Sequence, residues 1–79
     1  MDIHTDATLD TIGTLCPVPI HLTSKKMKAL KTGQILEVLS DDPGILHDLP
    51  AWCQTTGQTI LASSQEGACY RFYLRKQVE

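Results

Sequence analysis

The sequence predicts a single two-layer α/β (α+β) domain, residues 1–79, with the element order βαβαββ. Its 79 residues allow one domain with a modest core. Two segments, 17–31 and 42–57, space their apolar residues as amphipathic helices do, and both are flanked by strand-like segments. The last third of the chain alternates with the period of a strand. The two helices connect successive strands, and such connections are right-handed. Both helices therefore lie on one face of a four-stranded mixed sheet, and its other face is open.

The first third of the chain is predicted to hold one strand and one helix. Residues 1–6 are polar and acidic, and we expect a loose N-terminal tail there. β-Branched residues indicate a short strand over 7–12, which Gly13 ends. Helical spacing then runs from Pro17 to about Lys31, with one inward face made of Ile20, Thr23, Met27 and Leu30.

The middle of the chain predicts a central strand followed by a second helix. An apolar run over 34–40 ends at the turn signal Asp41-Asp42-Pro43. Asp42 suits the N-cap of the second helix, with Pro43 at its first position. Pro50 is expected to kink this helix or to start a second segment. The inward face is predicted to hold Ile45 or Leu46, Leu49, Trp52 and Cys53, and Gly57 closes the helix.

Two final strands, 58–64 and 68–75, are predicted to form a hairpin around the turn 65–67. Ile60 and Ala62 are expected on one face of the first strand. Strict alternation in the second strand assigns one face to Ala68, Tyr70, Phe72 and Leu74. The opposite face, directed toward water or a partner, holds Cys69, Arg71, Tyr73 and Arg75.

Composition excludes several classes of function. The net charge of −2 argues against nucleic acid as a ligand, because phosphate binding requires a basic patch. The one basic cluster (Lys25, Lys26, Lys28 and Lys31) is better explained as a solvated helix face. No apolar run is long enough to span a bilayer, and the acidic N-terminus does not resemble a signal peptide. We therefore expect a cytoplasmic protein without membrane contact.

The number and spacing of the three cysteines argue against a disulfide framework and against a zinc site. They are an odd number and include no CxxC pair. They predict neither a disulfide framework nor a zinc site, and no metal or other cofactor is expected. Cys53 fits the buried side of the second helix. Cys69 fits either an inert packed residue or, by its strand parity, an outward one.

Cys16 lies in the most informative segment, Gly13-Thr14-Leu15-Cys16-Pro17-Val18-Pro19. Proline is favoured in the first turn of a helix, so Pro17 and Pro19 fix the helix start and place Cys16 at the N-cap or beside it. Unpaired backbone N–H groups and the positive end of the helix dipole favour a thiolate or a persulfide anion there. The gain is on the order of 1 kcal/mol.

A catalytic base beside Cys16 is not evident. His21 lies more than one helical turn further along, His47 opens the second helix, and His4 lies in the tail. Hydrolysis by a cysteine nucleophile needs a base within hydrogen-bond reach. The segment instead favours chemistry in which thiolates attack and leave and the sulfur atom itself is handed over.

With these residues in place, the chain resembles the TusA/SirA family of small sulfur carrier proteins. Gly13 to Pro19 matches the family signature Gly-x-x-Cys-Pro-x-Pro, and the resemblance extends from about Leu9 to Lys76. The order Gly33, Asp42-Pro43, Trp52-Cys53, Gly57, Gly67 also fits. Leu15 and Val18 make the surroundings of Cys16 more apolar than in many members.

The resemblance implies a fold like that of the C-terminal domain of initiation factor three. It implies that Cys16 accepts sulfane sulfur as a persulfide, supported by Gly13, Pro17, Pro19 and, if not only a helix cap, Asp42. The implied donor is a cysteine desulfurase or a rhodanese-like protein, and the implied acceptor is a DsrE-like relay protein. The implied pathways are tRNA thiolation, sulfur oxidation and cofactor assembly. Such a chain is a persulfide carrier, monomeric or weakly self-associating, rather than a stand-alone turnover enzyme.

The alternative function is a non-catalytic interaction or regulatory module. Such a module would bind its partner through the open sheet face, with Arg71 and Tyr73 as contact residues. A thioredoxin-like reductase is disfavoured, since the chain has no resolving cysteine in a CxxC motif.

Overall fold

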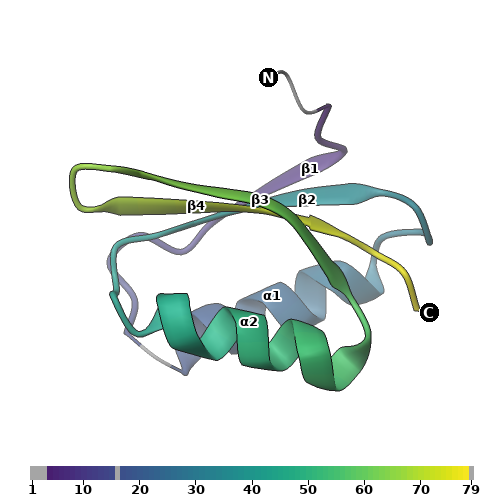
Figure 1. Ribbon diagram of the computed structural model, residues 1–79, viewed down its shortest axis with the longest axis horizontal. Coiled ribbons are helices and arrows are strands. Elements are labelled where there is room, and N and C mark those ends of the chain that lie inside the picture. Colours follow the sequence, from purple (N-terminus) through teal and green to yellow (C-terminus); the bar gives the residue numbers. More distant parts are fainter. Residues whose placement is uncertain (1–3, 16, 79) are drawn as a thin grey trace.

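A computed structural model describes residues 4–15 and 17–78. It confirms the predicted fold, with one sheet covered on a single face by two helices and open on the other (Figure 1). The six elements follow the expected order: β1 (Ala7–Asp10), α1 (Val18–Lys28), β2 (Ile35–Ser40), α2 (Ile45–Thr56), β3 (Thr59–Glu66) and β4 (Cys69–Arg75).

The sheet is mixed, with the strand order β1-β2-β4-β3. β1 pairs with β2 in parallel, and the other two pairs are antiparallel. Since parallel strands end at the same edge of a sheet, the loops that follow β1 and β2 come together there. Both helices begin at this end and run back along the sheet (Figure 1). We call it the helix-start end.

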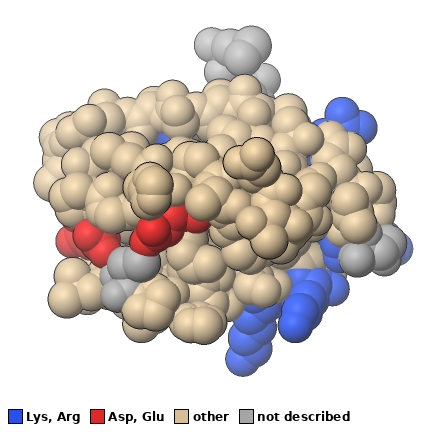
Figure 2. All heavy atoms as spheres, turned by 60° about the horizontal axis from the view of Figure 1, so that its bottom comes forward, with Lys and Arg blue, Asp and Glu red and all other residues tan. Residues whose placement is uncertain are grey.

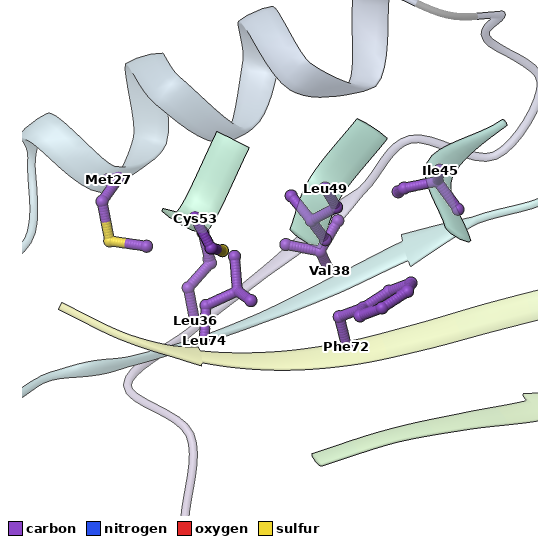
Figure 3. Close-up of a cluster of buried hydrophobic side chains, with 8 residues drawn as sticks. All are labelled: Met27, Leu36, Val38, Ile45, Leu49, Cys53, Phe72 and Leu74. Atoms are coloured by element: carbon purple, nitrogen blue, oxygen red, sulfur yellow. The ribbon is translucent and has the colours of Figure 1, made fainter. Parts of the chain in front are cut away.

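The core lies between the sheet and the two helices. Alternate residues of β2 and β4 point toward the helices, as the strand period predicts. Figure 3 shows these side chains meeting those of α1 and α2. The eight buried apolar residues are Met27, Leu36, Val38, Ile45, Leu49, Cys53, Phe72 and Leu74. Of the alternatives left open for the second helix, Ile45 is buried and Leu46 is 51% exposed.

The beginning of the chain differs in detail from the prediction. Asp6, expected within the loose tail, is already joined to β2, because its amide donates to the Ile35 carbonyl and its carboxylate accepts from the Ile35 amide, both at 2.8 Å. β1 ends at Asp10 rather than Ile12. The Asp10 carboxylate accepts a 2.9 Å hydrogen bond from the Ile12 amide, and this turn takes the chain out of the sheet.

α1 is shorter than the predicted segment at both ends. Its N-cap is Pro17, and Pro19 is the proline within its first turn. Beyond Lys28 the amides of Ala29 and Leu30 bond to carbonyls three residues back, so the helix tightens and stops before Lys31. No helix among the described residues is long and apolar enough to cross a membrane.

α2 begins two residues later than predicted. Its N-cap is Gly44, and Asp42 instead shapes the preceding turn. The Asp42 carboxylate accepts from the Gly44 amide at 3.0 Å, and its carbonyl accepts from the Ile45 amide at 3.0 Å. Pro50 starts no second segment, because the helix continues through it to Thr56. Pro50 has no N–H to donate to the Leu46 carbonyl four residues back. Both residues are exposed, so this carbonyl lies on the water side of the helix.

The terminal hairpin contains one wrong prediction. Ile60 and Ala62 do not share a face, because a bulge at Leu61 places Ile60 opposite Leu74 and Ala62 opposite Tyr73. Directly paired residues lie on the same face, so Ile60 faces the core and Ala62 the open side. The predicted alternation in β4 is correct, since Phe72 and Leu74 are buried.

We predict that Leu49→Ala lowers the free energy of unfolding by about 2–5 kcal/mol, because Leu49 is fully buried and its loss leaves a cavity. Leu46→Ala, in the same helix but 51% exposed, is the matched control and should cost less than about 0.5 kcal/mol. Urea unfolding followed by circular dichroism measures both. Equal losses would contradict the assigned orientation of α2.

Candidate functional site at the start of the first helix

The loop between β1 and α1 is fastened at its base to β2. Thr11 is buried, and its amide donates to the Leu39 carbonyl at 2.8 Å. Its hydroxyl donates to the same carbonyl at 2.5 Å. The hydroxyl and the amide of Thr14 donate in turn to the Thr11 carbonyl, at 2.7 and 3.1 Å. The loop therefore starts from a fixed point at the end of the parallel strand pair.

Gly13 makes the turn and joins this loop to the next one. Its φ of +88° lies in the left-handed region, which glycine adopts at little cost. Its amide donates a 3.0 Å hydrogen bond to the carboxylate of Asp41, which follows β2. Gly13, which was predicted to support the site, is therefore joined to Asp41, which was not selected from the sequence.

The two predicted prolines occupy different positions at the helix start. Pro17 is the exposed N-cap, and Pro19 is buried beneath the first turn. Pro19 packs beneath the turn, whereas Pro17 lies at the surface and follows Cys16 directly in the sequence. Cys16 itself lies outside the described residues.

Backbone donors are scarcer at this helix start than expected. Pro17 and Pro19 have no N–H. The Val18 amide donates to the Leu15 carbonyl at 2.9 Å, and the Ile20 amide donates to the Pro17 carbonyl at 3.1 Å. The expected group of unpaired N–H donors is therefore absent from Pro17 to Ile20, and the helix dipole is the remaining favourable influence on an anion there.

Three carboxylates at the helix-start end form what we call the acidic rim. They belong to Asp10, Asp41 and Asp42, and each accepts a backbone amide at 2.9–3.0 Å. Asp42 was selected from the sequence, and the other two were not. Figure 2 shows acidic side chains toward one end of the helix-bearing side and basic side chains mainly toward the other. The last turn of α1 carries Lys25, Lys26 and Lys28.

Exposed apolar side chains accompany the acidic rim. Leu15 is 74% exposed, and three others at this end are between 42% and 51% exposed. Together they form what we call the apolar patch: Ile12, Leu15, Val18 and Leu46. Leu15 and Val18 flank the Cys16-Pro17 pair in sequence.

The other two cysteines have different environments. Cys53 is 3% exposed in the core, and burial raises the pKa of its thiol to about 11. Cys69 begins β4 and is partly buried. The expectation that Cys53 is a packed core residue is confirmed. No cluster of three or more His, Cys, Asp or Glu side chains suitable for a metal occurs within residues 4–15 and 17–78.

The open sheet face carries a charged network centred on Arg71. Its Nη1 donates to the Glu66 carboxylate at 3.1 Å. Its Nε lies 3.3 Å from a Glu37 oxygen, an ionic contact rather than an aligned hydrogen bond. Thr8 donates to the other Glu37 oxygen at 3.1 Å. Glu66, followed by Glu37, holds the pKa of Arg71 above its usual value. Much of the predicted interaction face is therefore paired within the chain.

A hollow of about 300 Å³ lies away from the Cys16 segment. Residues from the second half of each helix and from the segment after β4 line it, including Met27, Lys28, Trp52, Thr56, Lys76 and Val78. No described residue of the β1–α1 loop contributes to it.

The described residues form a small open α/β sandwich in which the loop that contains the cysteine segment leads from β1 to a fixed helix start. The chain belongs to the TusA sulfurtransferase family, whose model matches residues 7–76. This match confirms the family suggested by the Gly13 to Pro19 segment.

Two known proteins show the extent of the similarity. Over 68 residues the chain is 46% identical to a Bacillus subtilis (strain 168) protein that is named provisionally as the sulfur carrier protein YrkF. That alignment covers 86% of this chain and 37% of YrkF, so the chain spans little more than a third of that relative. The crystal structure of a SirA-like protein from Desulfitobacterium hafniense superposes on this chain with a TM-score of 0.79 at 19% sequence identity. The match covers 91% of this chain and 99% of that one, and it supports the fold.

We predict that the high pKa of Cys53 makes stability fall as the pH rises from about 9 toward about 11. The unfolded thiol ionises near 9.0 whereas the folded thiol stays neutral to about 11, so deprotonation favours unfolding across this window. Urea unfolding at several pH values measures the loss. Cys53→Ala, compared with the parent, should show a smaller decline. An identical pH dependence in both proteins would contradict the assignment.

Proposed function

We propose that this chain carries sulfane sulfur as a persulfide on Cys16 and transfers it to an acceptor protein. The observation that carries the proposal is the family match over residues 7–76, which includes a Gly-x-x-Cys-Pro-x-Pro segment at an exposed helix start. The 46% identity to a protein named as a sulfur carrier supports the same activity.

The proposed reaction is two successive exchanges between thiolates and persulfides. The Cys16 thiolate attacks the outer sulfur of a donor persulfide, and the donor's S–S bond breaks with its electron pair leaving on the donor thiolate. Cys16 then carries the outer sulfur. An acceptor thiolate attacks that sulfur, and the pair from the second broken S–S bond returns to Cys16. Each bond made replaces one bond broken, so no external oxidant or reductant is required.

The supporting residues act on the position of the loop. Pro17 caps the helix and buried Pro19 fixes its first turn, while Gly13 supplies the left-handed turn. Asp42 orders the turn that leads into α2 through its 3.0 Å hydrogen bond from Gly44. In this proposal these residues hold the segment in an exposed position, and the partner proteins supply acid–base catalysis.

The partner proteins follow from the same proposal. A sulfur carrier requires a donor and an acceptor, and we infer a cysteine desulfurase or a rhodanese-like protein as donor and a DsrE-like protein as acceptor. The free thiols of Cys53 and Cys69 suit a reducing compartment, so we assign the exchange to the cytoplasm. The pathway served is tRNA thiolation, sulfur oxidation or cofactor assembly.

We predict that incubation with a cysteine desulfurase and free cysteine adds the mass of one sulfur atom to Cys16. Intact-protein and peptide mass spectrometry under non-reducing conditions locates the addition. Cys16→Ser should abolish it, whereas Cys69→Ser is the matched control and should retain it. A persulfide confined to Cys53 or Cys69 would refute the proposed carrier site.

The alternative, an interaction module acting through the open sheet face, makes the opposite prediction. Partner binding would survive Cys16→Ser and would fail for substitutions at Arg71 or Tyr73. The internal pairing of Arg71 with Glu37 and Glu66 weakens this alternative, because a partner would have to compete with contacts already present.

A further inference from the structure

The apolar patch is concentrated in one place. Six large apolar side chains are exposed among residues 4–15 and 17–78, and four of them lie at the helix-start end. Exposed apolar residues scattered singly are ordinary, but a group at one end of a small domain marks an interaction surface. The patch also brackets the segment that contains Cys16, so a molecule covering it would approach that cysteine.

The acidic rim gives this surface a definite charge. Asp10 and Asp41 are exposed, and within the described part of the chain neither takes part in an ion pair. Their hydrogen bonds are to neutral backbone amides, which fix the carboxylates without cancelling their charge. Basic side chains lie mainly toward the other end of the helix-bearing side (Figure 2). The local charge is therefore more negative than the net charge of −2 alone indicates.

We propose that the helix-start end docks a sulfur-transfer partner whose contact face has an apolar centre surrounded by lysine or arginine. This inference rests on the proposed function, because it specifies the protein that exchanges sulfur with Cys16. Apolar contact with Leu15 and Leu46 contributes affinity, and the carboxylates select the sign of the partner's charge and speed its approach. A second copy of the chain fits less well, because two acidic rims would face each other.

The same surface disfavours small anionic thiols as sulfur acceptors. A carboxylate-bearing thiol that approaches the helix-start end is repelled by the acidic rim, whereas a basic protein surface is attracted. The rim thus favours transfer to a matching protein over loss of sulfur to anionic metabolites.

Short activated peptides test the proposal without knowledge of the natural partner. The thiol form of a Cys69→Ser protein is mixed with pyridyl-disulfide derivatives of Lys-Leu-Cys-Leu-Lys, Glu-Leu-Cys-Leu-Glu and Lys-Ser-Cys-Ser-Lys. The Cys16 thiolate attacks the peptide sulfur and releases pyridinethione, whose absorbance gives the rate. The ratio of the rates with two peptides does not depend on the thiolate fraction of Cys16, because that fraction is the same for both. The rates of 2-mercaptoethanol with the same peptides give their intrinsic reactivities, and each protein rate is divided by the corresponding one.

We predict that the normalised rate with the Lys-Leu peptide exceeds that with the Glu-Leu peptide by about tenfold at low ionic strength. The preference should shrink as salt is added, since salt screens exposed charges. Asp41→Asn combined with Asp42→Asn should reduce it at least about threefold, because the amides keep an acceptor oxygen and lose the charge.

Matched controls separate local effects from general ones. Asp6→Asn, at the other end of β1, also removes a carboxylate charge that accepts a backbone amide and should leave the charge preference unchanged. Leu15→Ser with Leu46→Ser should slow the Lys-Leu peptide relative to the Lys-Ser peptide. Leu61→Ser, which changes a 40% exposed leucine on β3, should not.

Three outcomes would overturn the docking proposal. The first is equal normalised rates with cationic and anionic peptides. The second is that Asp6→Asn reduces the charge preference as much as Asp41→Asn combined with Asp42→Asn. The third is a dimer in sedimentation that Leu15→Ser dissociates. The assay uses the thiol, so it is independent of sulfur loading. If Cys16 acquires no sulfur, the proposed function fails while the peptide preference still reports the surface. If Cys16 loads normally and the preference is absent, the docking proposal alone fails.

Discussion

The parallel pairing of β1 with β2 is the constraint on which the site depends. It brings the carboxyl ends of two strands to one edge, so the loops after Asp10 and Ser40 become neighbours although about thirty residues separate them in sequence. Thr11 bonds to the end of β2, and Gly13 bonds to Asp41 just beyond it. The start of α1 therefore takes its position from the sheet. The helices pack on one face because their apolar sides meet alternate residues of β2 and β4.

Two opposing electrostatic influences act at this edge. The helix dipole favours a negative charge at the start of α1 by about 0.3–1 kcal/mol. Exposed unit charges a few ångströms apart interact by a similar amount, so a carboxylate of the acidic rim at that distance from an anion would offset the gain. In the proposed function, an anionic sulfur near the rim would then gain little net stabilisation from the helix dipole. In the proposed docking, a basic partner surface would reverse this balance on contact and would stabilise the anionic sulfur when the partner arrives.

Sequence reasoning predicted the fold well because its signals are local and periodic. The inward face of α1, the burial of Leu49 and Cys53, and the alternation of β4 follow from spacing alone. The bulge at Leu61 could not be predicted, since inserting one residue into a strand depends on the pairing of β3 with β4. The start of α2 was missed by two residues because Asp42 can close a turn as readily as it caps a helix.

The candidate site was predicted less completely. Gly13, Pro17 and Pro19 are recognisable from their motif, but Asp41 becomes relevant only through its contact with an amide 28 residues away. The adjacent pair Asp41-Asp42 was the available signal, and it indicated only a turn. The acidic rim and the apolar patch combine residues from separate segments, and only the parallel strand pair brings them together.

The prolines of α1 have a consequence for cargo release. A helix start rich in unpaired amides would donate hydrogen bonds to an anion and stabilise its bound state. Pro17 and Pro19 contribute no donors, and the amides of Val18 and Ile20 are already engaged. In the proposed function, a sulfur atom that receives no hydrogen bond from these amides would leave for another thiolate at little thermodynamic cost in either direction. Such shallow retention suits an intermediate in a relay, where the direction of flow is determined by the proteins before and after it.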